Sequence, residues 1–208
     1  MYKKGLIWIV VLLIIVAGLV VGKIFLNKQT PISTSPTPTT STQEGTPDAW
    51  NTYASTKDGY KISYPPEFNL KDDNIFLVDH NATGTEIDFP STYTTGTNLR
   101  EAYVGITNRK VATPADCYAS FNGGENSSST VTINGITFNK IDESGAGAGN
   151  YYEDVRYAVV KGDSCYNVAL FMHSVQRLNY PEETRPAEFD RAAVTNIFDE
   201  IMKTFSLL

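Results

Sequence analysis

An uninterrupted apolar run from Gly5 to Gly22 constrains this chain more than any other feature of its sequence. Its 18 residues include no charged side chain and no strongly polar one. In a helix, at about 1.5 Å per residue, they extend roughly 27 Å, close to the thickness of a bilayer's hydrocarbon core. A buried helix of this length in a water-soluble protein would show a polar stripe, and this run has none. The run predicts a transmembrane helix within residues 1–27.

Two alternatives to an uncleaved anchor remain open. A cleaved signal peptide has a shorter apolar region followed by a small-residue cleavage site, and no such site follows this run. The start KKGLIWIVVLL also resembles a prepilin leader, but Val10 stands where pilins carry Glu, and Pro31 would break the long pilin helix. We expect an anchor. Lys3 and Lys4 slightly favour a cytoplasmic N-terminus under the positive-inside rule.

Residues 28–47 form a polar segment between the apolar run and the rest of the chain. Fourteen of the 19 residues from Gln29 to Pro47 are Thr, Ser or Pro. Such a composition cannot bury enough apolar surface to offset its ordering entropy, and proline favours an extended backbone. The segment is therefore predicted to be a linker that holds the following domain away from the membrane.

Residues 48–208 have the composition of one globular domain. They contain 13 basic and 22 acidic side chains, so their net charge is −9. An acidic domain without a basic run is unsuited to binding nucleic acid through its phosphates. The expected partners are the membrane, through the N-terminal helix, and an unknown protein or cell-envelope component.

Alternating apolar and polar residues predict several antiparallel strands in this domain. The clearest signal is Asn134–Gly135, a pair that favours a type I′ hairpin turn between two β-branched runs. Thr113 and Pro114 predict the start of a short helix, and an amphipathic helix is predicted from Pro186 to Thr204. The expected strands are Tyr60–Tyr64, Ile75–Val78, Glu86–Phe89, Tyr103–Thr107, the hairpin Thr130–Ile141, Tyr152–Val160 and Cys165–His173. The predicted fold class is α+β, with a final helix packed on an antiparallel sheet.

Short motifs at both ends of the domain resemble a known family. They are Trp50-x-x-Tyr53, Asp58-Gly59-Tyr60-Lys-Ile-Ser-Tyr64-Pro65-Pro66 and Phe198-x-x-Ile201-x-x-Thr204-Phe205. These motifs resemble the PsbP/Mog1-like superfamily, in particular small membrane-anchored bacterial members, over most of residues 50–208. The resemblance implies an α/β/α sandwich around an antiparallel sheet. It also implies a binding role without catalysis, because characterised members dock on a photosystem or on a small GTPase.

The cysteines and histidines are the candidate residues for chemistry. Cys117 and Cys165 are the only thiols, and an even pair outside the membrane favours a disulfide. His80 and His173 are the only histidines, and either one beside a carboxylate would suit a cell-envelope hydrolase, which is the alternative function. No spacing favours a zinc site, and the glycine-rich run Gly145–Gly149 is flanked by predicted strands rather than by a strand and a helix.

Together these features predict a membrane-tethered, extracytoplasmic binding or accessory domain. No catalytic residue, metal or cofactor is predicted, and Cys117–Cys165 is the single assigned residue pair. The pilin-like subunit and the hydrolase remain as alternatives.

Overall fold

The computed structural model of the protein describes residues 50–71, 83–119 and 125–208. The predicted membrane helix, the linker, the strand Ile75–Val78 and His80 all lie outside these residues. Across the three described ranges, no helix combines the length and apolar character needed to cross a bilayer.

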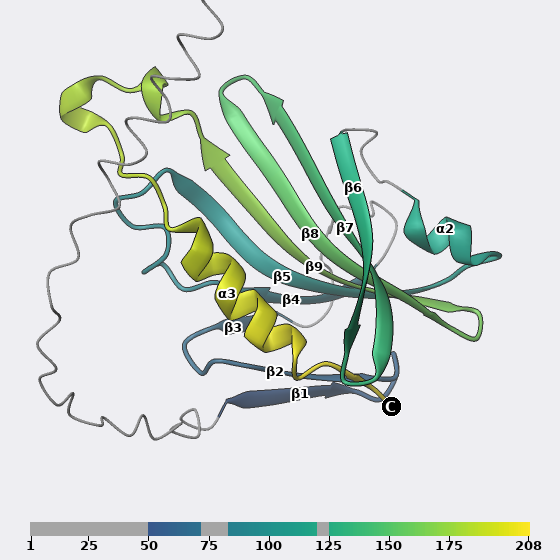
Figure 1. The fold of residues 1–208 in the computed structure, drawn as a ribbon. Coiled ribbons are helices and arrows are strands. Elements are labelled where there is room, and N and C mark those ends of the chain that lie inside the picture. Colours follow the sequence, from purple (N-terminus) through teal and green to yellow (C-terminus); the bar gives the residue numbers. More distant parts are fainter. Residues whose placement is uncertain (1–49, 72–82, 120–124) are drawn as a thin grey trace, which may run out of the picture. The chain divides into compact units, whose positions relative to one another are not determined.

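Two antiparallel sheets dominate the described residues (Figure 1). The larger sheet has seven strands in the order β3-β4-β5-β9-β8-β7-β6. They are β3 (Asn69–Lys71), β4 (Gly84–Asp88), β5 (Leu99–Lys110), β6 (Glu125–Ile133), β7 (Ile136–Gly147), β8 (Asn150–Lys161) and β9 (Ser164–Val175). The smaller sheet has the order β1-β2-β10, with β1 (Asn51–Ser55), β2 (Tyr60–Tyr64) and β10 (Ser206–Leu207).

The predicted hairpin is confirmed at the β6–β7 turn. Asn134 and Gly135 have φ angles of 51° and 76°, the positive values that a type I′ turn requires. Ile133 pairs with Ile136 directly across this turn. The hairpin is longer than the predicted Thr130–Ile141, because β6 and β7 pair from Glu125 and Ser144 up to the turn.

Helix α3 (Arg191–Met202) covers one face of the larger sheet and contacts β9 and β2 (Figure 1). Its buried residues are Val194, Phe198, Ile201 and Met202. Phe198 packs on Tyr157 of β8, with ring centroids 5.6 Å apart. The predicted amphipathic helix therefore forms, and its apolar face is the one that meets the sheet.

The C-terminus closes the fold by joining the smaller sheet. Thr204 follows α3, and its hydroxyl accepts a 2.7 Å hydrogen bond from the backbone N–H of Ser63 on β2. Phe205 then stacks on the buried Tyr60, whose hydroxyl donates to Thr85 of β4 at 2.7 Å. These contacts link the smaller sheet to the larger one.

The final helix begins later than predicted. The prediction placed its start at Pro186, whereas α3 begins at Arg191 and is capped by Asp190, whose side chain accepts from the N–H of Ala193 at 2.9 Å. Residues 186–190 are not helical, and the 3-10 helices η1 (Arg177–Asn179) and η2 (Glu182–Thr184) lie before them. Residue 187 cannot be helical, because Ala187 forms a parallel bridge with Thr97.

The opposite face of the larger sheet carries the short helix α2 (Pro114–Tyr118). Thr113 and Asp116 form a reciprocal capping box, and Pro114 is the first helical residue, as predicted for the start of this helix. The antiparallel α+β architecture agrees with the prediction. The helical layers are thinner than the implied α/β/α sandwich, because α2 has five residues and the described ranges contain only one other α-helix.

Candidate functional site

A cleft of about 500 Å³ opens where β8 begins and β9 ends, on the face of the sheet that α3 covers. One wall is the start of β8, with Tyr151 and Glu153, and a second is the end of β9 with the turn that follows it, residues 174–178. The third wall is the segment that leads into α3, with Arg185, Glu188, Phe189 and Arg191. We call this the arginine cleft. Its volume lies in the range of small-molecule sites.

The segment that makes the third wall is held in place by Asn98. The Asn98 side chain donates to the carbonyl of Val175 at 3.0 Å and accepts from the N–H of Phe189 at 3.0 Å. Its backbone N–H donates to the carbonyl of Ala187 at 2.8 Å. One buried amide thus joins the end of β9 to the segment before α3, so the shape of the arginine cleft depends on it.

A β-bulge lies beside this amide. Leu99 pairs with Ser174 and Glu101 pairs with His173, so Arg100 is the extra residue on β5. Bulges redirect a side chain and often lie next to functional sites. Here the Arg100 guanidinium donates to the Tyr180 hydroxyl at 2.7 Å.

Two of the three arginines that line the cleft are neutralised by carboxylates. Arg191 forms an ion pair with Glu153 of β8. Arg177 lies 3.4 Å from Glu188 and also donates through Nε to the carbonyl of Pro186 at 2.9 Å. These two ion pairs connect the walls of the cleft. Each pair has no net charge, so neither adds to the net charge of the cleft.

The third arginine has no carboxylate partner within the described ranges. Arg185 donates only to the carbonyl of Tyr180, at 3.5 Å, which is a long hydrogen bond. Arginine stays charged and has five N–H donors. Arg185 therefore gives the arginine cleft a net charge of about +1 and leaves open donors at its rim.

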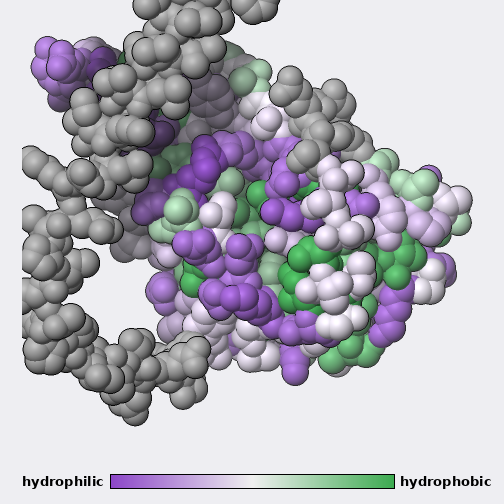
Figure 2. Space-filling model, viewed as in Figure 1, coloured by the Kyte–Doolittle hydropathy of each residue, from purple (hydrophilic) through white to green (hydrophobic). Residues whose placement is uncertain are grey.

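Apolar side chains complete the lining. Leu178 of η1 lies at the rim with 72% of its surface exposed, the most exposed large hydrophobic residue described. Phe189 is buried beneath, and the Arg191 guanidinium lies 5.0 Å from the centre of its ring. Tyr151 donates a hydrogen bond to Gln176, which joins the first two walls. In the view of Figure 2 the segment with η1 and η2 is mostly hydrophilic.

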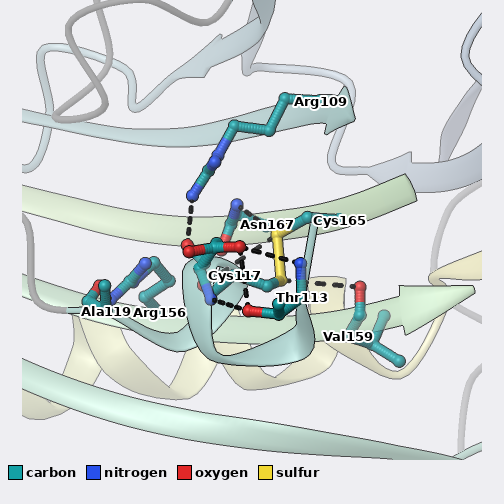
Figure 3. Close-up of a disulfide and its surroundings, with 9 residues drawn as sticks. Arg109, Thr113, Cys117, Ala119, Arg156, Val159, Cys165 and Asn167 are labelled. Atoms are coloured by element: carbon teal, nitrogen blue, oxygen red, sulfur yellow. Dashed lines mark hydrogen bonds between the residues drawn. A yellow bond between two sulfur atoms is a disulfide. The ribbon is translucent and has the colours of Figure 1, made fainter. Parts of the chain in front are cut away.

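The disulfide joins α2 to the start of β9 (Figure 3), whereas the arginine cleft lies at the end of β9. Cys117 of α2 and Cys165 of β9 are bonded at an S–S distance of 2.01 Å, and both are fully buried. Arg109 donates to the carbonyl of Asp116 at 2.6 Å, and Asn167 donates to the Cys165 sulfur at 3.3 Å. The bond fixes α2 to the sheet.

A buried carboxyl lies on the face of the sheet opposite α3. Asp154 of β8 is 6% exposed and pairs in register with Glu143 of β7. Burial, the largest cause, and the negative charge of Glu143 together raise the pKa of Asp154 to about 7, and Arg156 opposes this shift. Asp154 therefore titrates near neutral pH.

In the described part of the chain, His173 is bonded to an amide rather than to the carboxylate that the hydrolase alternative expects. Its Nε2 is hydrogen-bonded to the side-chain oxygen of Asn150 at 2.8 Å, and its ring stacks on Tyr152 with centroids 4.7 Å apart. No carboxylate is bonded to it in the part of the chain that the structure describes. The same part of the chain contains no group of three or more His, Cys, Asp or Glu side chains that could hold a metal ion.

The arginine cleft was missed in the sequence, although a signal for it was present. The chain contains six arginines, and three of them lie within residues 177–191 of an acidic domain. The fourth arginine near the cleft, Arg100, comes from β5 and had no sequence signal.

No protein-family model and no curated protein matches this chain. Solved structures do resemble it. A protein from Bacteroides thetaiotaomicron aligns with a TM-score of 0.44 and 13% identity over 76% of this chain and 48% of its own, so this chain spans about half its length. LpqN of Mycobacterium tuberculosis, described as involved in cell envelope biogenesis, aligns with a TM-score of 0.45 and 8% identity over 76% and 90% of the two chains.

A third solved structure is the cyanobacterial PsbP, CyanoP, of Synechocystis. It aligns with a TM-score of 0.31 and 12% identity over 88% of this chain and 99% of its own. These similarities concern the fold alone, and no ligand or partner is carried over from them.

Proposed function

We propose that this chain is a membrane-tethered, extracytoplasmic binding domain that holds its ligand in the arginine cleft and catalyses no reaction. Residues 1–27 anchor it with a cytoplasmic N-terminus, residues 28–47 are the spacer, and residues 48–208 present the cleft. The observation that carries the proposal is Arg185, an open cation in a 500 Å³ cleft of an acidic domain.

The chemistry of the cleft supports binding rather than catalysis. Its two carboxylates, Glu153 and Glu188, are both ion-paired with arginines, and arginine does not exchange protons at physiological pH. No histidine or cysteine is among its described lining residues. The groups on offer therefore hold and orient a ligand, and they do not transfer protons or act as nucleophiles.

The disulfide supports the extracytoplasmic location, because structural disulfides persist in oxidising compartments. Protease treatment of intact cells tests this part with the full-length chain. We expect residues 48–208 to be degraded from outside, and both cysteines to resist alkylation until a reductant is added. Protection from external protease in intact cells, together with cysteines that react without reductant, would contradict the proposed location.

Site-specific photo-crosslinking tests the cleft itself. A benzoylphenylalanine in place of Leu178, at the rim, is compared in living cells with the same probe in place of Thr132, on the exposed β6–β7 hairpin. We expect a discrete crosslinked product at position 178 that is absent at position 132. Identical products at the two positions would refute a specific role for the cleft.

A further inference from the structure

Arginine is concentrated at the arginine cleft far beyond its share of the domain. Three of the six arginines of the chain line it, and Arg100 contacts Tyr180 beside it. No lysine is among the described lining residues. The planar guanidinium matches the geometry of carboxylate and phosphate groups, whereas lysine supplies only a point charge. In a domain of net charge −9, this pattern is typical of a local anion site rather than of general electrostatic attraction.

The contacts of these arginines indicate two roles: two of them hold the walls of the cleft together, and one has N–H groups that a ligand could bind. Arg177 and Arg191 hold the walls together through Glu188 and Glu153. Arg185 has no acidic partner in the described chain, and it projects from the segment between η2 and α3. An anion that enters the cleft therefore meets one arginine whose donors are free for it.

Apolar surface lies close to that donor. Leu178 at the rim, Val175 on the second wall and Phe189 beneath belong to the same cleft as Arg185. An inorganic ion would leave this surface in contact with water. A ligand with an apolar group beside its anion would cover it, which stabilises the complex in proportion to the area removed from water.

We infer that the arginine cleft binds a small ligand in which a carboxylate or phosphate group is joined to an apolar group. Arg185 binds the anion, and Leu178 contacts the apolar part. The volume of about 500 Å³ suits a small molecule rather than a folded partner. This inference rests on the proposed function, since it assigns a ligand class to the same cleft.

Calorimetric titration of the full-length chain in phosphatidylcholine nanodiscs tests the inference. The probes are phenyl phosphate, 4-phenylbutyrate, the neutral 4-phenyl-1-butanol and inorganic phosphate. We expect at least one of the two anionic apolar probes to bind tenfold or more tightly than both the neutral probe and inorganic phosphate. The better of the two identifies the anion as a phosphate or a carboxylate.

Two variants locate the binding. Arg185→Gln should weaken the binding of the anionic probe about tenfold or more, because it removes a charge-assisted hydrogen bond. Lys57→Gln, on the exposed β1–β2 turn, changes the net charge equally and should have no effect. Leu178→Asn should weaken the binding of the anionic apolar probe and leave the binding of inorganic phosphate unchanged.

Three results would overturn the inference. The first is that the neutral probe binds as tightly as the anionic apolar probes. The second is that Arg185→Gln binds the anionic probe with the affinity of the wild type. The third is that no soluble probe binds and the domain binds only to nanodiscs or vesicles that contain anionic lipid. If no probe binds while crosslinking at position 178 persists, the ligand class is wrong and the proposed function stands. If crosslinking at position 178 is also lost, the proposed function fails with it.

Discussion

Removal of the Cys117–Cys165 bond should destabilise the domain strongly. The two cysteines are 48 residues apart in sequence and join α2 to β9. The cleanest perturbation is reduction of the wild-type protein, because both buried sulfurs stay in place and only the cross-link is lost. The Cys117→Ala/Cys165→Ala double variant serves as an independent form of the same perturbation.

The magnitude follows from the length of the loop that the bond closes. The loop-closure entropy for a separation of 48 residues corresponds to about 4 kcal/mol at 25 °C. With a urea m-value of about 1–3 kcal/mol/M, this shifts the unfolding midpoint by about 2 M. In a domain of this size the melting temperature should fall by about 8–16 °C. The double variant should lose somewhat more, since it also removes buried sulfur.

Urea unfolding of the full-length chain in detergent, followed by circular dichroism with and without reductant, measures the shift. Hydrogen exchange adds a local test. Helix α2 has only five residues, which is too short to be stable without tertiary contacts. Its amides should therefore lose protection first upon reduction, before those of the β8–β9 pair.

Equal unfolding midpoints for oxidised and reduced protein would refute this reasoning. A difference below about 1 kcal/mol would show that the unfolded chain is already compact in this region, so that the cross-link removes little entropy. Exchange that rises evenly over the whole sheet, without a first loss at α2, would show that the bond does not act locally.

Three further predictions concern other parts of the domain. Asn98→Ala should lower the free energy of unfolding by about 2–4 kcal/mol in urea titrations, because it removes two side-chain hydrogen bonds and leaves buried backbone groups unpaired; an unchanged midpoint would contradict this. In the folded protein Asp154 has a pKa of about 7, above its usual value. Its protonated form therefore contributes fully to the stability of the folded protein below about pH 4, and this contribution is lost as the pH rises through 7. Asp154→Asn should therefore be more stable than wild type at pH 8, by at least about 1.4 kcal/mol, with the difference vanishing near pH 4. Thr204→Val should cost about 1–3 kcal/mol, because it leaves the backbone N–H of Ser63 without its acceptor, and a melting temperature equal to that of wild type would refute this.

Much of the fold was predictable because local rules dictated it. The alternation in Tyr60–Tyr64 produced β2 with the bounds expected. The Asn134–Gly135 turn and the Thr113 cap form as predicted, since each depends on residues only a few positions apart. The Arg191–Met202 helix follows from its apolar spacing, which is also a local property.

The candidate site was not predictable on the same basis. Its arginines come from the turn after β9, from the end of η2 and from the start of α3. Its shape depends on Asn98, which is 91 residues from Phe189. The sequence around Arg185 does not show that Arg177 and Arg191 form ion pairs with carboxylates whereas Arg185 does not. The outcome depends on which carboxylates the fold brings close.

The sequence by itself determined strand β2, the Asn134–Gly135 turn, the Thr113 cap and the antiparallel class, because side-chain periodicity and turn chemistry act over a few residues. Only the tertiary structure decided that α3 starts at Arg191 and that the residues before it line a cleft. Pro186 and its neighbours are compatible with a helical start. The hydrogen bonds from Asn98 and the Thr97–Ala187 bridge hold that segment extended, and contacts between residues about 90 positions apart outweigh local preference there.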